Sequence, residues 1–141
     1  MKRDVASLLR DHGIQPAAQR WAVADYVLST DDHPAAEDVL RRAKANLPMI
    51  SRATVYNTLN LLCDKGLLRE LVLAEGRVVF DCNVSAHHHF IDDQTGRIHD
   101  VPWEAVKVSR VDQLPGYDVK EYMVVMRGRR HTGGKGRGRR G

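Results

Sequence analysis

The chain has 141 residues, enough for one domain or two small ones, and its 22 Lys and Arg against 18 Asp and Glu give a formal charge of +4. Residues 127–141 hold seven of the basic residues and no acid, so residues 1–126 carry 15 positive and 18 negative charges, a net charge of −3. Bulk charge is therefore weak evidence for nucleic-acid binding. Neither a membrane-length apolar run nor a signal-peptide pattern is present, so we expect a soluble, cytoplasmic protein with no membrane partner.

The first part of the chain has the periodicity of helices. Residues 5–9 predict a short first helix ended by Gly13, because glycine suits a left-handed C-cap. Pro16 opens a second predicted helix, and its apolar positions recur three and four residues apart. A third predicted helix begins near Pro34, with acidic residues at its positive end.

Residues 51–62 predict a fourth helix, with Ser51 as N-cap and Gly66 after its end. Apolar residues form one stripe for burial, namely Val55, Leu59 and Leu62. Polar residues face outward, namely Arg52, Thr54, Tyr56, Asn57 and Asn60. Amides can bond base edges, and an arginine and hydroxyls can bond phosphates, so this face is a candidate for reading DNA. The alternative is an ordinary solvated helix face.

Residues 67–73 and 77–81 predict a β-hairpin around a turn that contains Gly76. Three helices, a polar-faced fourth helix and a hairpin make a winged helix-turn-helix, which would place its recognition helix in the major groove of double-stranded operator DNA.

Residues 78–126 have a different pattern, with short alternating segments that predict a small second domain. Only 101–111 looks helical, and 117–126 predicts a strand. The fold class is therefore α+β: a winged helix-turn-helix domain over 1–78, a small C-terminal α/β domain over 79–128 and a disordered Gly/Arg-rich tail over 129–141. Because one helix-turn-helix reads only a half-site, we expect the second domain to form a homodimer.

Three consecutive histidines lie in a segment predicted to be extended, so His87 and His89 should share one face and His88 the other. With Asp81 before them and Asp100 on the next predicted strand, they could surround one divalent metal, and His33 could be a fifth ligand. The set has no thiolate, which suits Fe²⁺ or Mn²⁺ and tolerates Zn²⁺ in vitro or Ni²⁺.

Each of these residues also has a reading without a metal. The histidine run can be a solvated surface strand, and His33 can be a neighbour of a helix cap. Cys63 and Cys82 are the only cysteines and form no Cys-x-x-Cys pair, which excludes a structural four-cysteine zinc site. We expect Cys63 to be a small core residue and Cys82 to lie on the other strand face, where a redox role is open.

The order of these motifs resembles the ferric uptake regulator (Fur) family of metal-dependent repressors over about residues 5–128. The matching motifs are the polar-faced helix at 52–59, a hairpin ending in Asp81, the histidines at 87–89 and Gly-Arg-Ile-His-Asp at 96–100. The resemblance implies a winged helix, a dimerisation domain and a regulatory metal site. The ligands that it implies are His33, Asp81, His87, His89 and Asp100.

Asp100 and Asn57 resemble the peroxide-sensing PerR branch. At these two positions, iron sensors commonly have glutamate and arginine instead. The resemblance implies that Fe²⁺ holds the DNA-binding form and that H₂O₂ then oxidises a ligand histidine, His33 or His87, which releases repression. Mn²⁺ would support DNA binding without that chemistry.

The histidine run followed by Phe90, without cysteine pairs, also resembles the iron- or haem-responsive Irr branch, in which His88 would help to bind haem. This is the alternative function.

Two hypotheses outside the family are a metalloenzyme that uses the His/Asp set and a nucleic-acid chaperone that uses the basic tail. A metalloenzyme would leave the helix-turn-helix without a role, so we expect no enzymatic activity. On the chaperone reading, deletion of 127–141 should abolish nucleic-acid binding.

Overall fold

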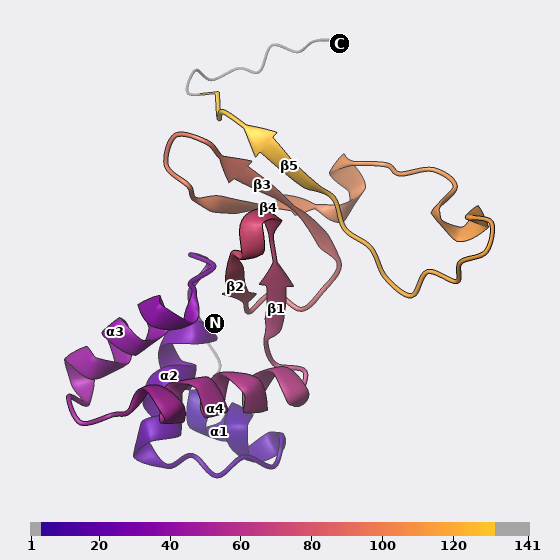
Figure 1. Cartoon of the computed structure of the whole chain (residues 1–141). Coiled ribbons are helices and arrows are strands. Elements are labelled where there is room, and N and C mark those ends of the chain that lie inside the picture. The colour runs from indigo at the N-terminus through magenta and orange to yellow at the C-terminus, as the bar shows by residue number, and fades with distance from the viewer. Residues whose placement is uncertain (1–3, 132–141) are drawn as a thin grey trace. The chain divides into compact units, whose positions relative to one another are not determined.

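The computed structural model describes residues 4–131, and these form two compact units, one up to Ser85 and one from Ala86 (Figure 1). The division expected from sequence, after residue 78, falls inside the second hairpin strand. Residues 79–85 group with the first unit because that strand pairs within it. Residues 132–141, most of the expected disordered tail, lie outside the described part of the chain.

The first unit begins with four α-helices: α1 (Val5–Asp11), α2 (Ala18–Val27), α3 (Ala36–Asn46) and α4 (Arg52–Asp64). The predicted caps are confirmed at three ends. Gly13 and Gly66 have φ of +74° and +77°, a conformation that glycine adopts without steric cost. Ser51 accepts a hydrogen bond from the Thr54 backbone N–H at 3.1 Å, as an N-cap does.

A single apolar core fills the first unit, and all four α-helices contribute to it. The predicted stripe of α4 is confirmed, since Val55, Leu59 and Leu62 are each no more than 1% exposed. They pack with buried residues of the other helices, of the loop before α4 and of the hairpin, including Leu9, Val23, Val27, Val39, Ile50 and Phe80. This burial fixes which face of α4 stays outside.

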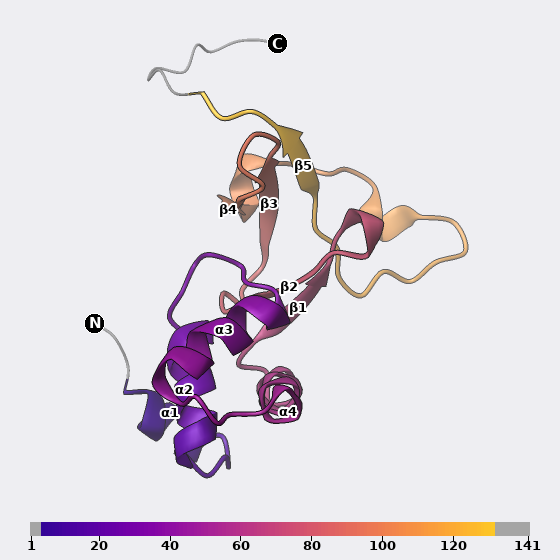
Figure 2. The ribbon, with the colours of Figure 1, turned by 60° about the vertical axis from the view of Figure 1, so that its left-hand side comes forward.

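The hairpin follows as β1 (Arg69–Val72) and β2 (Val78–Asp81), an antiparallel pair joined through a 3-10 turn, η1 (Ala74–Gly76). Glu75 and Gly76 both have positive φ in this turn. The predicted winged helix-turn-helix is therefore present in the first unit, with α4 as the fourth helix and β1–β2 as the wing (Figure 2).

The second unit contains a three-stranded sheet in the order β4-β3-β5, formed by β3 (His87–Asp92), β4 (Ile98–Pro102) and β5 (Val125–Gly128). β3 pairs antiparallel with β4 and parallel with β5, and β5 lies beside β3 in both ribbon views (Figures 1 and 2). Two 3-10 turns, η2 (Trp103–Ala105) and η3 (Val111–Gln113), follow β4.

Two predictions for this unit were wrong. The helix expected over 101–111 is replaced by the end of β4 and separate 3-10 turns. Val101 and Pro102 instead pair with His88 and His87 in the β-ladder, so the segment begins as a strand, and Arg110 near its end has φ of +65°, outside the helical region.

The strand expected over 117–126 begins only at Val125, which pairs with His89 of β3. The preceding N–H, that of Val124, donates instead to the ring Nδ1 of His88 at 3.0 Å. No helix in the described part of the chain is long and apolar enough to span a membrane.

Candidate metal ligands and recognition surface

His33 and Asp81 form a buried pair in the first unit, each 4% exposed. His33 Nε2 lies 3.4 Å from Asp81 Oδ2, and Asp81 Oδ1 accepts from the Asn83 backbone N–H at 2.9 Å. The loop that carries His33 is held to the wing, since the Phe80 backbone N–H donates to the Pro34 carbonyl at 2.8 Å. His33 directly precedes Pro34, and Asp81 directly follows Phe80. This backbone hydrogen bond therefore holds the two segments together next to the His33–Asp81 pair.

The backbone of His33 is strained, because it has φ of +55° and precedes a proline. A side chain with a Cβ pays a steric cost in this region, and a residue before proline normally takes an extended conformation. Such strain persists only where surrounding contacts impose it. In this structure, the strained conformation of His33 occurs together with the contact between its imidazole and the Asp81 carboxylate.

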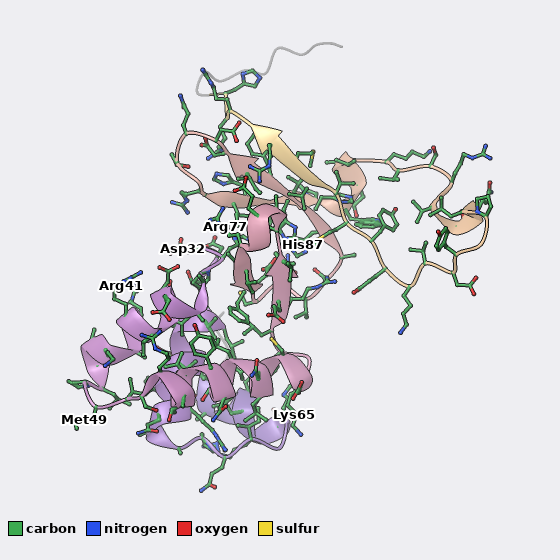
Figure 3. All side chains as sticks on the ribbon, viewed as in Figure 1. Asp32, Arg41, Met49, Lys65, Arg77 and His87 are labelled. Atoms are coloured by element: carbon green, nitrogen blue, oxygen red, sulfur yellow. The ribbon has the colours of Figure 1, made fainter. Side chains whose placement is uncertain are left out.

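The second unit places His87, His89 and Asp100 together, as the strand alternation predicted for the two histidines. β3 and β4 pair so that His89 faces Asp100. Asp100 Oδ1 lies 3.3 Å from His87 Nε2 and 3.8 Å from His89 Nε2, and the two imidazole rings are 4.5 Å apart. Both histidines are buried, and the Asp100 side chain is 32% exposed. Figure 3 shows His87 at the start of β3.

His88 has different surroundings, as its place on the other strand face predicts. Its ring stacks on Trp103 at 4.5 Å between centroids, and its Nδ1 accepts the Val124 N–H. The side chain is fully buried. His88 therefore joins β3 to the segments that carry Trp103 and Val124, and it does not contribute to the group around Asp100.

Each unit thus offers a small group of nitrogen and carboxylate oxygen donors, which are ligand types that divalent first-row metals accept. Histidine ligands with carboxylates and no sulfur fit Mn²⁺ and Fe²⁺ and do not exclude Zn²⁺. His33 and Asp81 supply one group, and His87, His89 and Asp100 supply the other.

Neither of the two cysteines belongs to these donor groups. Burial, followed by the nearby Glu70 and Asp64 carboxylates, raises the pKa of the Cys63 thiol to about 11. Cys63 packs against the helical core, as expected, and a raised pKa suppresses its nucleophilic thiolate. The Cys82 thiol donates to the Thr30 carbonyl, with Sγ and O 3.2 Å apart.

The outward face of α4 has the predicted composition. Four of the five residues predicted to contact DNA are exposed, namely Arg52, Tyr56, Asn57 and Asn60, and Thr54 is half-buried. The Thr58 hydroxyl donates to the Thr54 carbonyl at 2.8 Å and is buried, so it belongs to the packed side.

The sequence reasoning missed two elements of this surface. Gln19 and Arg20 of α2 line, with Thr54 and Asn57 of α4, a polar hollow of about 400 Å³. Glu37 of α3 accepts hydrogen bonds from two side chains of the α4 face. A Gln-Arg pair after Pro16 is a weak signal for such a hollow, and only packing reveals that α2 and α3 border α4.

Comparison with known proteins identifies the family. The model of the ferric uptake regulator family matches residues 11–127, most of the 141-residue chain. The chain belongs to the ferric uptake regulator family. Members of this family are metal-responsive transcription regulators, and this chain is one of them.

Among curated Fur-family proteins, the chain is similar to the peroxide-responsive repressor PerR of Staphylococcus aureus (strain Mu50 / ATCC 700699). The two are 32% identical over 130 residues, which is 91% of this chain and 87% of the relative. The expected resemblance to the PerR branch is confirmed at this level of similarity.

Solved Fur-family structures share the fold. A zinc-bound manganese uptake regulator has a TM-score of 0.68 at 23% identity, over 92% of this chain and 100% of that one. The Campylobacter jejuni peroxide stress regulator has a TM-score of 0.66 at 24% identity, over 92% and 98%. The expected fold, a winged helix-turn-helix followed by a small domain of mixed helix and sheet, is confirmed by this likeness.

Proposed function

We propose that this Fur-family regulator is a metal-dependent repressor that senses peroxide through oxidation of a ligand histidine. The observation that carries the proposal is the group in which Asp100 contacts both His87 and His89 across two paired strands. An aspartate in this place resembles the peroxide-sensing branch, and a PerR repressor is among the chain's relatives at 32% identity.

The proposed ligands of the regulatory ion, which the resemblance to the family implies, are His33, Asp81, His87, His89 and Asp100. A metal ion that binds one conformation of the regulator more tightly than another would couple metal binding to DNA binding. Fe²⁺ or Mn²⁺ suits the donors, and Zn²⁺ can bind in vitro. Without cysteine pairs, the chain offers no structural four-cysteine zinc site.

Fe²⁺ held by these residues would supply the redox chemistry for oxidation of a ligand imidazole by H₂O₂, in which a ring carbon gains one oxygen atom and the other oxygen leaves as water. Mn²⁺ would not supply it. His33 and His87 are the proposed targets, and each lies beside a carboxylate that orients its ring. An oxidised ring is a poorer ligand, so the chain's own contacts then hold the ion less well. Loss of the ion would release repression.

We further propose that the regulator binds a palindromic operator in double-stranded DNA as a homodimer, with Arg52, Thr54, Tyr56, Asn57 and Asn60 of α4 in the major groove. Arg20 and Gln19, which line the hollow beside α4, add contacts to the phosphate backbone. The proposal places the protein in the cytoplasm and gives it a regulatory role without enzymatic turnover.

Mass spectrometry tests the sensing step. Protein that contains Fe²⁺ and protein that contains Mn²⁺ are each exposed to low peroxide, and peptides are mapped. The expected result is one added oxygen atom on His33 or His87 in the iron sample only. Equal oxidation in both samples, or none in either, contradicts peroxide sensing.

The haem-responsive alternative makes a different prediction for the same protein. It requires a role for His88 in binding haem, yet His88 is fully buried, stacked on Trp103 and bonded at Nδ1. Unmodified protein that instead binds haem through residues 87–89 would favour that alternative over peroxide sensing.

A further inference from the structure

Glu37 on α3 contacts two side chains of the α4 recognition face. Its Oε2 accepts a hydrogen bond from the Arg52 guanidinium and another from the Tyr56 hydroxyl, the latter at 3.1 Å. Arg52 and Tyr56 belong to the set proposed to contact DNA. One carboxylate thus engages two members of that set.

The contact removes the charge that α4 would otherwise present. Arg52 is the only basic residue in the helix, and the Glu37 carboxylate neutralises its guanidinium. The other exposed polar residues on this face, Asn57 and Asn60, are uncharged amides. With the pair formed, α4 therefore offers hydrogen-bonding groups to base edges and little attraction to phosphates of arbitrary sequence.

We propose that Glu37 is a positioning residue for sequence specificity, an inference that rests on the proposed binding of DNA by α4. Glu37 holds Arg52 and Tyr56 in one orientation and prevents Arg52 from gripping the phosphates of any duplex. The two charged side chains are 53% and 62% exposed, so their ion pair is weak enough to rearrange on a matching site. Without Glu37, Arg52 gains a sequence-independent phosphate contact.

The test compares Glu37→Gln with Asp38→Asn in the full chain with Mn²⁺. Asp38 is a matched control, because it lies on the same helix and its loss changes the net charge equally, but it pairs with Arg41 of its own helix. Dissociation constants are measured between 50 and 200 mM salt on two probes. One probe is the duplex that the wild-type protein selects from a random pool, and the other is the unselected pool.

The Glu37→Gln protein should bind the unselected pool several-fold more tightly than wild type at low salt. One added phosphate contact steepens the slope of log affinity against log salt by about 0.9, so affinity should fall roughly threefold more than that of wild type across this salt range. The ratio of selected to unselected affinity should drop. Asp38→Asn should leave the slope unchanged.

Arg52→Gln provides a second arm, since Glu37→Gln should have no further effect on the slope in that background. Equal slopes for Glu37→Gln and Asp38→Asn overturn the inference, and so does a steeper slope that persists without Arg52. Failure of the wild-type protein to select any duplex contradicts the proposed function instead. In that case, the slopes on the unselected pool still decide whether Glu37 restrains Arg52.

Discussion

The strained backbone at His33 gives a prediction that separates folding from metal binding. His33→Ala and His33→Gly both remove the imidazole from its buried contact with Asp81. Loss of a buried partner to a carboxylate costs about 1–3 kcal/mol of stability in either variant. The two variants differ only in the Cβ methyl group of alanine, which restricts the backbone at a position where φ is +55°.

The difference between them follows from two opposing effects. Alanine keeps the left-handed penalty, about 1–2 kcal/mol for a residue with a Cβ. Glycine does not have this penalty, but the greater backbone freedom of glycine in the unfolded chain lowers the stability of the folded protein by about 0.5–1 kcal/mol. His33→Gly should therefore be more stable than His33→Ala by about 0.5–1 kcal/mol, an inversion of the usual order for this pair.

Urea unfolding followed by far-ultraviolet circular dichroism measures this difference. All α-helices of the described chain lie in the first unit, so the helical signal reports the unit that contains His33. A His33→Ala protein as stable as His33→Gly would refute the strain argument. Manganese titration of the same two proteins is an independent readout, because undiminished affinity in both would contradict the role of His33 as a ligand.

Three further predictions concern other parts of the molecule. Asp100→Glu should keep Mn²⁺-dependent DNA binding but lose histidine oxidation by peroxide in the Fe²⁺ protein; peptide mass spectrometry with and without peroxide checks this, and undiminished oxidation would contradict it. Leu59→Ala should cost about 2–5 kcal/mol in urea unfolding, because Leu59 is 1% exposed in the core, whereas the exposed neighbour Asn60→Ala should stay within about 0.5 kcal/mol. Since the pKa of Cys63 is raised from 9.0 to about 11, its thiolate at pH 8 should be about 100-fold scarcer in the folded protein. Iodoacetamide should accordingly alkylate it far more slowly than in urea, with peptide mapping to distinguish Cys82, and equal rates would contradict the raised pKa.

Local patterns determined most of the first unit. The spacing of Val55, Leu59 and Leu62 predicted which side of α4 is buried, because an amphipathic helix has one low-energy orientation against a core. The caps at Gly13, Ser51 and Gly66 followed from backbone chemistry within a few residues.

The second unit shows where local patterns fail. The expected helix at 101–111 is absent, and the last strand starts at Val125 instead of residue 117. A strand exists only where another strand offers hydrogen bonds, so its limits depend on pairing with a distant segment. Here the ring of His88, 36 residues away, takes the Val124 N–H, and no local pattern could reveal that.

The same distinction applies to the candidate sites. Strand alternation alone determined that His87 and His89 share a face without His88, because successive side chains point to opposite sides of a strand. Tertiary structure decided that Asp100 contacts both rings, that His33 adopts a strained conformation beside Asp81, and that Glu37 engages Arg52 and Tyr56. Sequence spacing gives the direction of a side chain within its own element, whereas the partner that it meets depends on how separate elements pack.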